Sequence, residues 1–129
     1  MATLTPTLTL ESTDATSDTL SFSITDTLTV TDPQIGLSKI AATTTGANQI
    51  ILPSVDAVRY EYIKHTAVDA GGSATSQILQ VETADDTYPI SLGAGEFMFA
   101  PIHDGNATLI QLEAASGTIV AEYAYWTKG

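Results

Sequence analysis

The chain contains no cysteine, so its fold uses neither disulfide bonds nor thiolate metal sites and depends on packing or on contacts between subunits. Basic residues are also scarce: 4 lysines and arginines stand against 15 aspartates and glutamates, giving a formal net charge of −11. Such a surface repels phosphate groups, which argues against nucleic-acid partners and against anionic membranes.

Long apolar runs are missing too. No stretch approaches the roughly 20 apolar residues that span a bilayer. The first residues, Met1 to Thr3, lack the basic and apolar segments of a signal peptide. We therefore expect a protein that is made in a cytoplasm, has no membrane partner, and stays soluble or joins an assembly there.

What the sequence has in abundance is alternation of hydroxyl and apolar side chains. Across residues 19–24, Leu20, Phe22 and Ile24 would line one face of a strand, and threonine and serine the other. Threonine also fits a pleated surface better than a helix. We predict one all-β chain, an antiparallel β-sandwich or jelly-roll-like fold of roughly nine or ten short strands.

Turn signals separate the expected strands, and Thr25-Asp26 is either a tight hairpin or a bulge within one longer strand. Phe97 and Phe99 share a face that we expect to lie in the core. The expected strand segments are residues 5–11, 19–24, 27–31, 37–42, 49–52, 58–65, 76–83, 88–92, 96–102, 107–114 and 118–126, of which 19–24 and 27–31 count as one strand if Thr25-Asp26 is a bulge.

The amino-acid composition of the chain changes near Asp32-Pro33. Residues 1–32 are rich in threonine and carry no base, whereas the body, residues 33–129, holds all the bases and tyrosines. The first segment is predicted to be either a β-ladder within a single domain or an N-terminal arm. An arm would add to a sheet edge, on its own or a neighbouring subunit.

Residues that could act in catalysis or bind a metal do not form a recognisable motif. His65 and His103 are expected at ordinary polar positions near the surface, and a Gly-x-Ser-x-Gly elbow is absent. The aspartates in the predicted turns are expected to accept hydrogen bonds from backbone amides. The alternative is a calcium site built from two such loops. We predict no catalytic, cofactor-binding or metal residue, no cofactor and no enzyme. The strand glutamates are expected to face solvent: Glu61, Glu82, Glu96, Glu113 and Glu122.

The strand at 118–126 is apolar on both faces, because Tyr125 and Trp126 point opposite ways. Such a strand is either central in a two-layer core or in contact with another subunit. An exposed Trp126 would also suit stacking on a glycan. The candidate subunit contacts are Leu8, Leu10, Tyr60, Tyr62, Tyr125 and Trp126.

Four segments, residues 18–30, 60–66, 92–101 and 117–126, resemble small virion structural proteins of tailed phages, especially those of marine cyanophages. The resemblance rests on strand-and-turn motifs and implies a non-enzymatic protein present in many copies on the particle. It suggests a capsid decoration or cement protein on the head exterior, made in the host cytoplasm. Its partners would be the major capsid protein and further copies of itself, for example as a trimer. A tail, neck or fibre-associated protein and a glycan-binding module are the alternatives.

Overall fold

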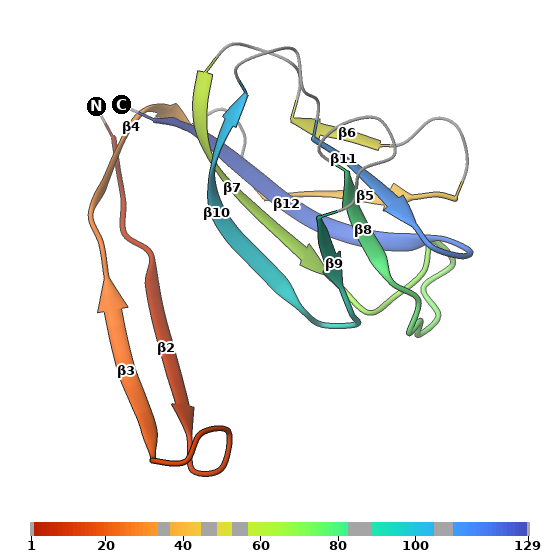
Figure 1. The fold of residues 1–129 in the computed structure, drawn as a ribbon. Helices are drawn as coiled ribbons and strands as arrows, with labels where there is room; N and C mark the ends of the chain where they lie inside the picture. Colours follow the sequence, from red (N-terminus) through yellow and green to blue (C-terminus); the bar gives the residue numbers. More distant parts are fainter. Residues whose placement is uncertain are drawn as a thin grey trace.

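The structure, a computed structural model, describes residues 2–33, 37–44, 49–52, 57–82, 89–104 and 110–128. These residues form twelve strands and no helix, and the paired strands run antiparallel. In Figure 1 a long hairpin projects from a body in which two sheets pack together. The predicted all-β, antiparallel sandwich is therefore confirmed, although the strands are more numerous than expected.

The larger sheet has the order β1-β4-β12-β7-β10, and β5 also pairs with β12. The strand β12 is the centre of this sheet because it pairs with three neighbours, β4, β5 and β7. Its strands are β1 (Ala2–Leu4), β4 (Leu28–Pro33), β5 (Ser38–Ala42), β7 (Ala57–His65), β10 (Phe97–Asp104) and β12 (Ile119–Lys128).

The smaller sheet has the order β6-β11-β8-β9 and covers one face of the larger sheet. Its strands are β6 (Gln49–Leu52), β8 (Leu79–Glu82), β9 (Ile90–Leu92) and β11 (Ile110–Ala114). The core between the sheets is built from aliphatic side chains that are at most 5% exposed, among them Ile63, Leu79, Leu112 and Ile119. This burial of apolar surface holds a fold that has no disulfide.

The remaining strands, β2 (Thr7–Ser12) and β3 (Leu20–Thr25), pair only with each other among the described strands. They continue the hairpin that β1 and β4 begin. The ladder is interrupted where Pro6 lies opposite Asp26, whose backbone N–H donates to the Pro6 carbonyl at 3.1 Å. Proline has no N–H to donate in return. Thr25-Asp26 is therefore an irregularity within one long strand path rather than a tight hairpin.

The prediction for Phe97 and Phe99 was wrong, because both lie on the face of the larger sheet that points away from the core. Phe97 is 62% exposed and Phe99 is 36% exposed. The register explains this placement: Met98 stands opposite Ile63 and packs against the core, so its two neighbours must point outward. We call this side of the larger sheet the outer face.

Within the described part of the chain, no helix is long and apolar enough to cross a membrane.

Candidate interaction surface

The projecting part of the hairpin, residues 7–25, has two chemically different faces, and we call it the arm. On one face Leu8 pairs with Ile24 and Leu10 pairs with Phe22. On the other face the hydroxyls of opposing residues hydrogen-bond across the strands: Thr7 to Thr25 at 2.9 Å and Thr9 to Ser23 at 3.0 Å. The alternating sequence thus produces an apolar face and a hydroxyl face on one two-stranded ribbon.

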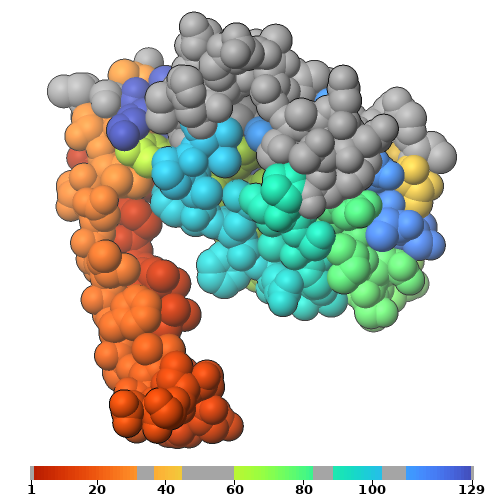
Figure 2. Space-filling view, in the orientation of Figure 1, coloured from red at the N-terminus to blue at the C-terminus, as the bar shows by residue number. Residues whose placement is uncertain are grey.

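The apolar face of the arm is open to solvent. Its side chains Leu8, Leu10, Phe22 and Ile24 are between 42% and 61% exposed. Figure 2 shows the arm standing clear of the body, and β2 and β3 contact chiefly each other. Glu11 is the one charged residue in β2 and β3, and the alternation places it on the hydroxyl face. The apolar face therefore carries no charge.

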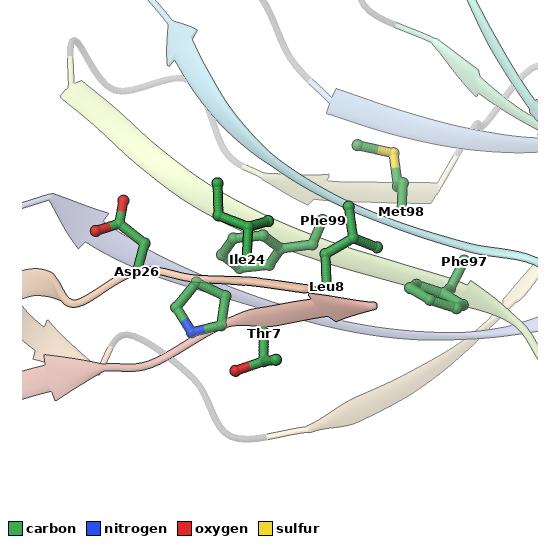
Figure 3. Close-up of a pocket in the computed structure, with 8 residues that line it drawn as sticks. Thr7, Leu8, Ile24, Asp26, Phe97, Met98 and Phe99 are labelled. Carbon is green, nitrogen blue, oxygen red and sulfur yellow. The ribbon is translucent and has the colours of Figure 1, made fainter. Parts of the chain in front are cut away.

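The body presents a second exposed apolar surface beside the arm, formed by Phe97 and Phe99 of β10, which we call the β10 wall. Arm and wall enclose an open groove of about 540 Å³. Figure 3 shows Leu8 and Ile24 on the arm side of this groove, opposite the two phenylalanines. The groove thus has apolar side chains on both sides and no protein filling it.

Aromatic contacts hold Phe99 of the β10 wall in place. The Phe99 ring stacks on Tyr60 with centroids 6.1 Å apart and an interplanar angle of 10°. It also lies 6.5 Å from Trp126 in a tilted arrangement, while the Lys128 ammonium sits 5.8 Å from the Tyr60 centroid. Such ring pairs contribute about 0.5–1.5 kcal/mol beyond their burial. The Phe99 side of the wall is therefore held in place by its neighbours.

The structure distributes the predicted contact residues over three places. Leu8 and Leu10 are exposed on the arm, whereas Tyr60 is only 5% exposed beneath Phe99. Tyr62 and Trp126 are half-buried on the outer face, and Tyr125 is half-buried on the opposite, core-facing side of β12. The contact prediction omitted Phe22, Ile24, Phe97 and Phe99. The alternating sequence places Phe22 and Ile24 on one face of a strand. It does not show whether another sheet covers this face, and both side chains are exposed because none of the described strands does.

Two further predictions about polar residues were wrong. His65 and Glu61 are both fully buried rather than at the surface, and Glu82 is 5% exposed. All of β7's odd-numbered residues from Glu61 to His65 point into the body, because Ile63 between them belongs to the core. The side chain of His103 lies outside the described residues.

No group of three or more histidine, cysteine, aspartate or glutamate side chains is placed to hold a metal ion among the described residues.

Tyr62 and Glu122 form a cross-strand hydrogen bond on the outer face, in which the Tyr62 hydroxyl donates to Glu122 Oε1 at 3.0 Å. Burial, this hydrogen bond and the negative charge of Glu122 raise the pKa of Tyr62 above its usual value of 10.0. A raised pKa means that the folded state retains the proton longer than the unfolded state, so this stabilisation is present below pH 10 and is lost as the pH rises above it.

We expect Tyr62→Phe to lower the free energy of unfolding by about 1 kcal/mol at neutral pH, because one hydrogen bond is lost. The difference between variant and wild type should shrink above pH 10, where Tyr62 ionises in the unfolded chain. Urea denaturation at several pH values measures both effects. A difference that grows with alkaline pH would contradict the assignment.

Comparisons of this chain with protein-family models, with curated proteins and with solved structures find no match.

Proposed function

We propose that the chain is a non-enzymatic structural protein of a tailed-phage virion, a capsid decoration or cement protein on the outside of the head. The arm with its exposed, uncharged apolar face is the observation that carries this proposal. The major capsid protein is the proposed partner on the shell. The resemblance to small phage virion proteins supplies the biological setting.

In the free chain the arm leaves apolar side chains exposed to water that would be more stable if they were covered. A two-stranded ribbon is marginally stable in water unless its apolar side is covered. An apolar patch with a polar rim is characteristic of a surface that binds another protein. The side chains of Leu8, Leu10, Phe22 and Ile24 meet this description, since hydroxyl groups occupy the other face. The arm therefore suits burial in an assembly.

The composition of the whole chain supports the same role. With a net charge of −11, free copies repel one another at long range and do not adhere to packaged DNA. Short-range burial of the arm's apolar side chains then provides the docking energy in this proposal. A protein that binds only the assembled shell stabilises that shell by mass action.

The experiment that tests the proposal is a cryo-EM map of the intact virion, with this chain located and its copies counted. We expect copies at regular lattice points on the head, with the arm buried against a neighbouring subunit. Location at the tail or neck, or absence from the particle, would overturn the assignment as a decoration protein.

A further inference from the structure

We infer that the arm of one copy packs its apolar face on the β10 wall of a second copy, so that copies of this chain associate by exchanging arms. The inference deepens the proposed function and rests on it for the arm's docking role, but it names a specific partner surface. The two surfaces are the arm's Leu8, Leu10, Phe22 and Ile24 and the wall's Phe97 and Phe99.

The two surfaces match in chemistry. The side chains of the arm's apolar face and of the wall are uncharged, and Glu11 points to the opposite side of the ribbon. Charged residues nearby include Asp26, which lines the groove, and Lys64, which stands opposite Phe97. Contact between them removes aliphatic and aromatic surface from water. Contact through the acidic remainder of the surface would place like charges together, so the arm and the wall are the favoured meeting point.

Each copy has both surfaces and leaves both unfilled. The arm overlooks its own wall across the open groove without closing onto it, since Ile24 and Phe97 stay 61% and 62% exposed. A second copy supplies the missing partner for each surface. When two copies exchange arms the contact is reciprocal, with each arm covered by the wall of the other copy. In addition, β10 is the last strand on its side of the larger sheet, among the described residues.

The area available is sufficient for a stable pair. An aromatic side chain buries roughly 150–250 Å² when fully covered. With about half of each of the six large apolar side chains exposed, the apolar surface offered is on the order of 500 Å² per copy. Two copies together bury about twice that amount, and the polar rim of the arm adds to it. The total of about 1,000 Å² reaches the threshold of roughly 1,000 Å² for a specific protein–protein interface.

Sedimentation analysis of the full-length protein tests the inference with a matched set of variants. Ile24→Lys on the arm and Phe97→Lys on the wall should each weaken self-association about 30-fold or more, because a charge is forced into the contact. Ser21→Lys is the control: it adds the same charge on the same strand, but on the hydroxyl face opposite Glu11, and should leave the association unchanged.

Mixing the two defective variants distinguishes arm-to-wall association from other ways in which two copies could pair. The Phe97→Lys chain has an intact arm and the Ile24→Lys chain has an intact wall, so the mixture should form a heterodimer with one of the two contacts. Arm-to-arm pairing predicts no such rescue. A wild-type protein that remains monomeric at all concentrations, or variants that associate normally, would overturn the inference.

Engineered cysteines distinguish a second copy from the chain's own arm, since the natural chain has no cysteine to interfere. Leu8→Cys and Phe97→Cys in separate chains should form a disulfide-linked heterodimer on oxidation. With both substitutions in one chain, a monomeric product alone would show that the arm closes on its own wall, contrary to the inference. These solution results do not depend on particle location, so absence from the virion would remove the proposed function while leaving the arm exchange measurable.

Discussion

If the proposed function is right, replacing residues 5–27 by Asn-Gly should abolish docking of the protein to the phage particle while the body stays folded. Leu4 and Leu28 are direct partners in the β1–β4 ladder, so a two-residue type I′ turn can join them without a change of register. The deletion removes Leu8, Leu10, Phe22 and Ile24 together. Losing even ~3 kcal/mol of interface free energy weakens binding by about 100-fold, and we expect a loss of at least that size.

The body should tolerate this deletion because β2 and β3 contribute no residue to the core between the two sheets. Binding to particles that lack the protein, followed by co-sedimentation, measures docking, and thermal unfolding measures stability. Ser21→Lys in the full-length chain is again the control for charge. Undiminished binding by the armless protein, with its body intact, would show that another surface docks.

His65→Ala should lower the free energy of unfolding by about 3 kcal/mol, the largest effect we expect from a single substitution away from the arm. The imidazole is fully buried, and both ring nitrogens have partners. Nδ1 accepts a hydrogen bond from the Ala67 N–H at 2.9 Å, which leaves Nε2 to donate to the Gln77 carbonyl at 2.9 Å. Alanine leaves both backbone groups without these partners and opens a cavity.

The ring also supports an unusual backbone segment, because Ala67 has a φ of 66° in the left-handed region. Denaturant unfolding with a linear extrapolation measures the loss. Gln77→Ala is the matched control: it removes an exposed side chain but keeps the carbonyl that His65 binds, so its effect should stay within about 0.5 kcal/mol. Equal effects of the two substitutions would contradict the role assigned to the ring.

Local alternation was sufficient to predict the fold class and most strand positions, because side-chain direction in a strand follows directly from sequence. It could not predict which face of a strand would be covered. In β7 the glutamate suggested that the side carrying Glu61 would face solvent and that the side carrying the tyrosines would be covered. Instead, Glu61, Ile63 and His65 point into the core. Pairing with β10 and β12 and coverage by the smaller sheet decide that outcome, and these contacts join residues far apart in sequence.

For the candidate interaction surface, too, the sequence predicts the local pattern of side chains but not the tertiary contacts that expose them. The two-faced character of the arm is visible in residues 7–25, since both strands alternate hydroxyl and apolar side chains. That β2 and β3 leave the sheet, and that Phe97 and Phe99 become an exposed wall, depends on tertiary register. Met98 takes the core position opposite Ile63, and no local pattern distinguishes Phe-Met-Phe with the phenylalanines inside from the reverse.

The central place of β12 also sets the order of events during synthesis. Ala2 and Lys128 are both register partners of Val30, which is 2% exposed, so the root of the hairpin is held by segments from opposite ends of the described chain. The larger sheet cannot be completed on the ribosome before residues 119–128 emerge, and such non-local pairing is slow to form. Until then the hairpin lacks its attachment to the body, so a nascent chain presents arm and wall together only after β12 has emerged and paired with β4.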